Sequence, residues 1–372
     1  MKIGYVSTYL PQQCGIATYT DYLIQGLLKA VQDTNVRIIC ETGARQFRRE
    51  RVEVIPCWHR DEDYVESILL QTRGLDVVHI QHEYSIYRFD ERLPTLLRSL
   101  EGITKRIITI HCVRPRQFSN VETIEDFTRE IAFGSDQVIV HLQSAKEILG
   151  RLGVPQEKIH VVAHGTELSD VKKKVARDRL RLPKTSKIFV MFGFVKPHKC
   201  THIALEAVKQ MSEEIEDVCF FLAGGLAPTA SEKDREYVIY LKSRIEELGM
   251  REKVIFPEKF FPNEDVPYIL GAADVILFPY YEEDRSSSGS LHLSIGAKRP
   301  VIASRIPKFA DLGDVCDELL VLPYNSSSIA EVTLRLFKDV EFERYVMERI
   351  EAYRKRTSWL STAAKHLEVY VK

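Results

Sequence analysis

Short apolar runs alternate with segments of helical periodicity from one end of the chain to the other. In the first half these runs are Ile3–Val6, Val36–Cys40, Val52–Ile55, Val77–Ile80, Arg106–Ile110, Gln137–Val140 and Ile159–Val162. The segments between them with apolar residues at helical spacing are Tyr19–Ala30, Tyr64–Leu70, Thr128–Phe133 and Ser144–Leu152. Continuous runs of this kind, separated by helices, predict a parallel sheet that is covered on both faces.

The same rhythm restarts in the second half. Its expected strands are Lys187–Phe192, Val218–Leu222, Val254–Phe256, Val275–Phe278, Val301–Ala303 and Glu318–Val321. Its expected helices are Thr201–Met211, Glu232–Leu248, Val266–Gly271, Leu291–Ala297 and Ile329–Phe337. Because Thr166–Ser186 is polar and basic, we interpret it as a solvated linker between two domains rather than as a nucleic-acid contact.

A chain of 372 residues is too long for one ordinary core. We therefore expect an α/β protein with two doubly wound, Rossmann-like domains facing across a cleft, at residues 1–168 and 169–355. Two further helices are expected at Glu341–Lys355 and Ser358–Val371. The apolar stripe of the last one has to pack on something, so we expect residues 356–372 to cross back to the first domain.

Composition narrows the function classes. Lys and Arg number 52 against 53 Asp and Glu, so no global basic field points to nucleic acid. The 7 cysteines are scattered without CxxC spacing, which predicts buried thiols in a reducing compartment and no zinc site. No apolar run approaches the roughly 20 residues that span a bilayer. We expect a cytoplasmic protein, with a peripheral membrane contact through the basic segment Arg45–Arg51 left open.

Candidate site residues follow the expected strands, because ligands of doubly wound sheets bind at the carboxyl ends of the strands. In the first half, Gly15 precedes a helix and allows close approach of a ligand. His82, Glu83 and Tyr84 follow the fourth strand, and His111 follows the fifth. Core packing explains such polar residues poorly, although a histidine at a strand end also serves as a structural donor to the backbone.

In the second half, the first strand leads into Gly193 and Phe194, and Lys199 stands at the start of the next helix. A phosphate at that point would meet both an ammonium and a helix dipole. The glycine pair Gly224 and Gly225 follows the next strand.

A later loop, Ser286-Ser-Ser-Gly-Ser290, joins an apolar strand to a helix that contains Ser294. Unpaired backbone N–H groups at such a helix start favour a phosphate or diphosphate. We therefore predict a phosphate or diphosphate site in this loop.

Three stretches together resemble the retaining GT-B glycosyltransferases of family 4, also called glycosyl transferases group 1. The stretches are the Gly15 loop with Thr109-Ile-His111, then Gly193-x5-Lys199, and then Ala272–Pro279 with Gly296–Ser304. The opening 20 residues and Gln81-His-Glu-Tyr84 are similar to a prokaryotic, mannosyltransferase-like branch. The resemblance covers almost the whole chain.

This resemblance implies transfer of a hexose, mannose or glucose, from GDP- or UDP-hexose to a carbohydrate or lipid-linked acceptor, with retention and without a required metal ion. It implies that His111 and Lys199 are catalytic, and that the acceptor side is formed by His82, Glu83 and Tyr84. The implied donor-binding residues are Gly15, Gly193, Phe194, Gly224, Gly225, Ser286, Ser288, Gly289, Ser290 and Ser294.

Two departures from the family pattern leave other functions open. Phe194 stands where the family usually has arginine, and Ser286 and Ser294 stand where it usually has two glutamates. A serine brings no charge and reaches less far than a glutamate. A phosphorylase or sugar-phosphate-using enzyme is one alternative, and a non-catalytic sugar-nucleotide or glycan-binding member is another. Glu282-Glu-Asp284 offers substitute carboxylates, although we expect a solvated loop there.

Overall fold

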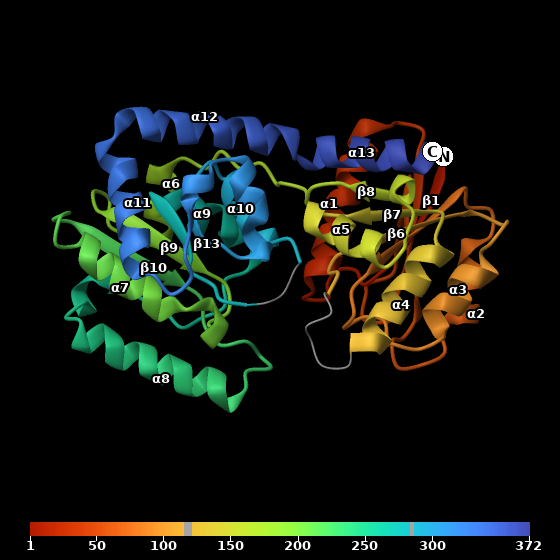
Figure 1. Cartoon of the computed structure of the whole chain (residues 1–372), viewed down its shortest axis with the longest axis horizontal. Coiled ribbons are helices and arrows are strands. Elements are labelled where there is room, and N and C mark those ends of the chain that lie inside the picture. Colours follow the sequence, from red (N-terminus) through yellow and green to blue (C-terminus); the bar gives the residue numbers. More distant parts are fainter. Residues whose placement is uncertain (115–120, 283–285) are drawn as a thin grey trace. The chain divides into compact units, whose positions relative to one another are not determined.

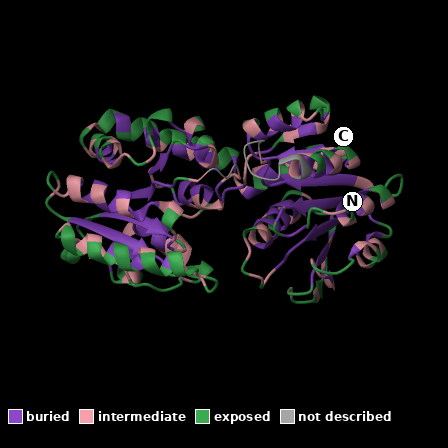
Figure 2. Cartoon of the chain, turned by 60° about the horizontal axis from the view of Figure 1, so that its bottom comes forward, coloured by how far each residue is buried: buried purple, intermediate pink, exposed green. Residues whose placement is uncertain are grey.

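The computed structural model describes residues 1–114, 121–282 and 286–372 (Figure 1). The chain divides into two compact units. The first holds residues 1–165 together with 286–289 and 357–372, and the second holds 166–282 and 290–356. Each unit is built around one mostly parallel sheet, and Figure 2 shows most strands of both sheets in the colour of buried residues.

The sheet of the first unit has the strand order β3-β4-β2-β1-β5-β6-β7-β8. Its strands are β1 (Lys2–Ser7), β2 (Asn35–Glu41), β3 (Phe47–Arg49), β4 (Val52–Trp58), β5 (Val77–His82), β6 (Lys105–Ile110), β7 (Gln137–Val140) and β8 (Ile159–Val161). All neighbours pair in parallel except β3, which pairs antiparallel with β4 and was not predicted.

Helices of the first unit are α1 (Gly15–Ala30), α2 (Val65–Thr72), α3 (Arg92–Ser99), α4 (Val121–Gly134), α5 (Gln143–Arg151) and α13 (Trp359–Val371). We did not predict α3, because Pro94 lies inside it. Proline is tolerated in the first turn of a helix, where the N–H that it lacks has no partner within the helix.

The sheet of the second unit has the order β11-β10-β9-β12-β13-β14. Its strands are β9 (Lys187–Phe192), β10 (Val218–Ala223), β11 (Val254–Ile255), β12 (Val275–Phe278), β13 (Val301–Ser304) and β14 (Leu320–Val321). The helices are α6 (Lys173–Leu180), α7 (Thr201–Met211), α8 (Glu232–Glu247), α9 (Val266–Ala272), α10 (Gly289–Gly296), α11 (Ser326–Lys338) and α12 (Val340–Arg356). Every strand pair is parallel, so the predicted doubly wound architecture is confirmed in both units.

Residues 166–186 are not the solvated linker that we expected. They contain α6, whose Arg177 is buried and donates from Nη2 to Asp274 Oδ2 at 2.7 Å. Lys173 Nζ lies 2.6 Å from the other oxygen of the same carboxylate. The basic run therefore neutralises a buried aspartate at the start of β12, which charge patterning in the sequence did not reveal.

The C-terminal helix α13 packs on α1, as predicted for the last residues of the chain (Figure 1). Trp359 stacks on Tyr22 of α1 with ring centroids 5.6 Å apart. A Cβ atom at Gly26 of α1 would overlap with the carbonyl oxygen of Trp359. Glycine at position 26 therefore permits the two helix backbones to approach closely.

The described residues were also compared with the requirements of a membrane span, a metal site and disulfides. No helix among them is long and apolar enough to cross a membrane. Nor do their His, Cys, Asp and Glu side chains form any group of at least three that could hold a metal ion. All 7 cysteines are free thiols, and Cys40, Cys112, Cys200, Cys219 and Cys316 are buried.

Gly26→Ala should destabilise the first unit, because its new methyl group displaces the backbone of α13. We expect a loss of about 1–3 kcal/mol in the free energy of unfolding, as for other overpacking substitutions. Gln25→Ala, on the exposed face of the same turn, is the matched control and should unfold at the wild-type temperature. Thermal unfolding followed by circular dichroism measures both; equal melting temperatures for the two variants would contradict the close packing.

Candidate active site

Lys199 is held at the carboxyl edge of the second sheet by a tight turn after β9. The turn begins at Gly193, whose φ of 90° is strained for any residue except glycine. A Cβ atom built on Gly193 would lie 3.2 Å from Lys199 Nζ. Glycine at this position thus leaves room for the ammonium directly beside the end of the strand.

Its surroundings perturb the protonation of this ammonium. The pKa of Lys199 is lowered from 10.5 to about 8, mainly by burial; the charge of Glu282 opposes this shift, and the charges of Lys308 and Lys196 contribute to it. The ring of Tyr280 lies beneath the ammonium, with its centroid 5.4 Å from Nζ. A partly desolvated ammonium interacts more strongly with an incoming phosphate than a fully hydrated one does.

Glu282 is the carboxylate that keeps Lys199 charged. Its side chain is only 18% exposed, forms an ion pair with Lys308 at 3.0 Å, and lies 3.8 Å from the ring of His198, whose pKa is lowered by burial. Our expectation of a solvated acidic loop is therefore wrong for Glu282. Glu283 and Asp284 lie outside the described residues. Glu282 is the fourth residue after the end of β12, and that position at the carboxyl edge was the available signal.

Four predicted donor residues surround one cavity of about 130 Å³ in the second unit: Gly193, Phe194, Gly224 and Gly225. A Cβ atom at Gly224 would overlap with the carbonyl oxygen of Gly193, and one at Gly225 would lie 2.8 Å from the backbone of Glu258. Both glycines are thus required for backbone packing around the cavity. The ring of Phe194 stacks on that of Phe260 with centroids 5.9 Å apart.

The residues of the serine loop, Ser286–Ser290, and Ser294 of α10 have different structural environments. Ser286 forms an isolated antiparallel bridge with Cys112, within the first unit. Ser288 is buried, and Gly289 and Ser290 open α10. Ser294 is also buried, and its hydroxyl donates to Ser290 O at 2.8 Å. The Ser294 hydroxyl is thus used within its own helix, whereas diphosphate contacts at Ser286, Ser288, Gly289 and Ser290 stay predictions.

Gly15 is the first residue of α1 in the first unit. An added Cβ atom at Gly15 would meet no described atom within 4 Å. The preceding residue, Cys14, makes no side-chain cap to the helix. Neither backbone conformation nor packing therefore demands glycine here, in contrast to Gly224 and Gly225. The close approach of a ligand to Gly15 stays a prediction.

His111 follows β6 and is 8% exposed. Both of its ring nitrogens have protein partners: Nε2 lies 2.8 Å from Gln81 Oε1, and Nδ1 lies 3.0 Å from His141 Nε2. Burial, followed by the charges of His141 and His164, holds the pKa of His111 well below its ordinary value. The ring is thus neutral and fixed in place.

The three predicted acceptor-side residues differ in accessibility. His82 is fully buried against Tyr84 and Phe127, and burial lowers its pKa to about 3. Neither ring nitrogen of His82 has a hydrogen-bond partner within the described part of the chain. Tyr84 is buried and its hydroxyl lies 2.7 Å from Thr128 Oγ1. Glu83 alone is partly exposed, so an acceptor would meet Glu83 first.

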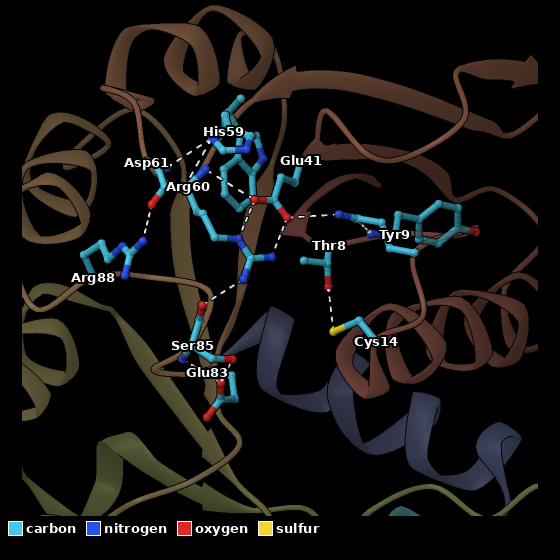
Figure 3. A network of polar contacts seen from close by, with 12 residues as sticks. Thr8, Tyr9, Cys14, Glu41, His59, Arg60, Asp61, Glu83, Ser85 and Arg88 are labelled. Carbon is cyan, nitrogen blue, oxygen red and sulfur yellow. Dashed lines mark hydrogen bonds and ion pairs between the residues drawn. The ribbon is translucent and has the colours of Figure 1, made fainter. Parts of the chain in front are cut away.

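Glu41, at the end of β2, organises the loops on the same edge of the first sheet (Figure 3). It is 3% exposed and accepts two hydrogen bonds of 2.6 Å from the Arg60 guanidinium and one of 3.0 Å from Gln12 Nε2. Burial alone would raise the pKa of Glu41, but these hydrogen bonds hold it below its ordinary value. Arg60 also donates to the carbonyl of Ser85 at 2.8 Å.

This one ion pair therefore ties the loop before Gly15 to the loop after Tyr84. The sequence analysis missed it, although a glutamate directly after the apolar run Val36–Cys40 was a visible signal. A buried carboxylate of this kind needs a paired cation, and the sequence did not reveal that Arg60 supplies it.

Two protein-family models match the chain. "Glycosyltransferase Family 4" matches residues 14–170, and "Glycosyl transferases group 1" matches residues 186–339. The chain belongs to glycosyltransferase family 4. It is 21% identical over 248 residues to the 2-deoxystreptamine glucosyltransferase of Streptomyces kanamyceticus, covering 62% of this chain and 61% of the relative. It is 28% identical over 199 residues to the D-inositol 3-phosphate glycosyltransferase of Corynebacterium urealyticum, covering 52% of this chain and 45% of that relative.

Several solved structures have the same fold as this chain and superpose over almost its whole length. Alr3699/HepE of Anabaena in complex with UDP superposes with a TM-score of 0.76 at 17% identity and covers 100% of both chains. A glycosyltransferase of Rickettsia africae gives 0.75 at 16%, covering 99% and 97%. Sucrose-phosphate synthase of Thermosynechococcus elongatus gives 0.73 at 19%, covering 100% and 98%. The predicted GT-B fold is confirmed.

Opposite shifts in the Lys199 pKa should follow from neutralising its two nearest charges. Burial sets the pKa of the wild-type ammonium to about 8, with Glu282 raising it and Lys308 lowering it. Glu282→Gln should move the midpoint to lower pH, and Lys308→Gln should move it to higher pH. NMR of ¹⁵N-labelled lysine side chains measures the midpoints, with Lys199→Arg assigning the resonance. Shifts of the same sign in both variants would refute this electrostatic account.

Proposed function

We propose that this chain is a retaining glycosyltransferase. It moves a hexose from a nucleoside-diphosphate sugar to a glycan, lipid-linked or small-molecule acceptor. The observation that carries the proposal is the partly desolvated Lys199 ammonium beside Gly193, at the carboxyl edge of the second sheet. Family membership supports the same reaction class.

Lys199 fits the role of stabilising the leaving group. When the glycosidic bond to the diphosphate breaks, negative charge grows on the departing phosphate oxygen. A fixed positive charge in a site of reduced dielectric lowers the energy of that state more than it lowers the energy of the bound substrate. The ammonium of Lys199 supplies this charge, and the start of α10 would add its N–H groups.

UDP-glucose is the donor that the similarities favour. HepE was solved with UDP and with UDP-glucose, and one curated relative is named as a glucosyltransferase. We therefore favour glucose over mannose as the transferred hexose, and UDP over GDP. We assign His111 to the wall of the sugar site and Gly15 to the close approach of the donor.

One observation favours a second candidate. In family 4 the glutamate usually found at position 294 binds the ribose hydroxyls, whereas here Ser294 brings no carboxylate and its hydroxyl is hydrogen-bonded within α10. A donor without ribose, such as a sugar 1-phosphate used by a phosphorylase, would not need that contact. A non-catalytic member that binds nucleotide sugars is the further alternative, which measured transfer would exclude.

UDP should raise the melting temperature of the wild-type protein and of Lys209→Ala, but not of Lys199→Ala. Lys209 lies on α7 near Lys199 in sequence and pairs with Glu213 on the surface, so it is the matched control. Differential scanning fluorimetry with UDP, GDP, ADP, inorganic phosphate and glucose 1-phosphate measures these shifts. Stabilisation by phosphate or sugar phosphate alone would favour the phosphorylase, and unchanged UDP binding by Lys199→Ala would overturn our assignment of Lys199.

Gly15→Ala should separate folding from function. The added methyl group meets open space, and alanine is about 1 kcal/mol more favourable than glycine inside a helix, so stability should be kept or gained. If a donor approaches Gly15, transfer from UDP-glucose should fall by about tenfold or more, because the methyl group displaces the donor. The readouts are thermal unfolding and UDP release. Full transfer activity in a stable Gly15→Ala protein would remove Gly15 from the site.

A further inference from the structure

A chain of buried hydrogen bonds runs through the first unit from the Val162 carbonyl to the hydroxyl of Tyr5. Its members lie in β1, β5 and α13 or directly after β6, β7 and β8, and all of them are buried. They are, in order, the Val162 carbonyl, His141, His111, Gln81, His79, Tyr370 and Tyr5. His111 is the member that we place in the sugar site.

The donor–acceptor distances in this series of side chains are those of normal hydrogen bonds. His141 Nδ1 lies 2.9 Å from Val162 O, and His141 Nε2 lies 3.0 Å from His111 Nδ1. The amide of Gln81 lies 2.8 Å from His111 Nε2 and 3.2 Å from His79 Nε2. All three side chains His79, Gln81 and His111 are buried, so each bond has to contain one donor and one acceptor.

The proton positions follow from the one partner that only accepts. Val162 O is a carbonyl oxygen, so His141 Nδ1 carries the proton of that bond. In a neutral His141 the Nε2 atom is then unprotonated, and it accepts from His111 Nδ1–H. In a neutral His111, Nε2 is unprotonated in turn and needs a donor.

Gln81 supplies that donor when its NH₂ group faces His111. The oxygen and nitrogen of a glutamine amide are assigned from the hydrogen-bond network, and this network selects the orientation with nitrogen toward His111. The amide oxygen then faces His79 Nε2, which carries a proton. The reverse orientation, with oxygen toward His111, would force an additional proton onto the buried pair of His111 and His141.

The C-terminal helix completes the chain. His79 Nδ1 is unprotonated in this arrangement and accepts from the hydroxyl of Tyr370 on α13, at 2.6 Å. Tyr370 in turn accepts from the hydroxyl of Tyr5, at 2.8 Å. Thr109 Oγ1, at 2.7 Å from His79 Nε2, accepts as well. Every bond thus has one donor and one acceptor without any charged histidine.

We propose that His141 is a positioning residue that holds His111 as the neutral Nδ1–H tautomer, with the Gln81 amide nitrogen bound to His111 Nε2. His111 then forms an uncharged wall of the sugar site that neither gives nor takes a proton during transfer. This inference rests on the proposed glycosyltransferase function only for its consequence on rate. The tautomers themselves are a property of the folded first unit.

A neutral His111 suits the proposed reaction. Cleavage of a glycosidic bond passes through a transition state in which the sugar ring carries positive charge. An imidazolium beside that ring would oppose the charge, whereas a neutral imidazole does not. The groups that bear on the charge state of His111 are His79, His82, His141 and His164, and burial is the largest cause of its lowered pKa.

The first experiment reads the tautomers of the wild-type protein directly. Its 11 histidines are labelled with ¹⁵N and their ring nitrogens are observed by NMR at neutral pH. Spectra of His111→Gln, His141→Gln and His79→Gln assign the three resonances. We expect Nδ1–H at His111 and His141 and Nε2–H at His79. A proton on His111 Nε2 would overturn the proposal, whether or not the protein transfers sugar.

The second experiment reverses the donor at the centre of the chain. Gln81→Glu replaces the amide by an isosteric group that accepts from both histidines when ionised. We expect the His111–His141 pair to bind one additional proton at neutral pH, visible in the same ¹⁵N spectra. We also expect kcat for UDP-glucose to fall by about tenfold or more, with KM for the donor changed by less than about threefold.

Gln137→Glu is the matched control. Gln137 Oε1 lies 2.6 Å from His160 Nε2 at the opposite end of the parallel strands, outside the chain of bonds. This substitution should change the protonation of His160 and leave kcat at the wild-type value. A neutral His111–His141 pair in Gln81→Glu, or a charged pair with unchanged kcat, would contradict the inference. No transfer by the wild-type protein from any nucleotide sugar would instead refute the proposed function and leave the tautomers standing.

Discussion

The balance of charge around Lys199 is the interaction on which the second unit's site depends. A lysine that leaves water tends to lose its proton, and the pKa of this one is lowered to about 8, mainly by burial. Glu282 opposes that loss, and Glu282 itself forms an ion pair with Lys308. The glycine at position 193 makes the arrangement possible, because any side chain there would press on the ammonium. Charge and backbone geometry thus act together to keep one cation partly dry at the end of β9.

The first unit solves the related problem of burying neutral polar groups. Its histidines and Gln81 can be buried in the neutral state as long as every hydrogen bond has one donor and one acceptor. That condition links His111 to the C-terminal helix through His79 and Tyr370. The Glu41–Arg60 pair applies the same condition to charged groups and ties the loops at the carboxyl edge together. In both cases residues far apart in sequence depend on one another for a satisfied partner.

Periodicity predicted the two parallel sheets, and the glycines and Lys199 were visible from their places after strands. Other elements were not predicted from the sequence, for identifiable reasons. We did not predict α3 because it contains Pro94, although a proline in the first turn is compatible with a helix. We did not predict α6, because its basic residues are typical of a solvated segment. The sequence does not show that Lys173 and Arg177 form ion pairs with Asp274. The short strand β3 lies in the basic segment Arg45–Arg51, for which we predicted no strand.

The sequence by itself determined the architecture, since runs of buried strands and amphipathic helices are local patterns that encode a doubly wound fold. It also determined which residues stand at the carboxyl edges of the strands. Only the tertiary structure decided the partners of those residues. Ser294 bonds its own helix, His82 is buried among aromatic rings, and His111 is bound through both nitrogens. The physical reason is that hydrogen bonds and charge interactions act through space, between groups whose separation along the chain carries no trace of their contact.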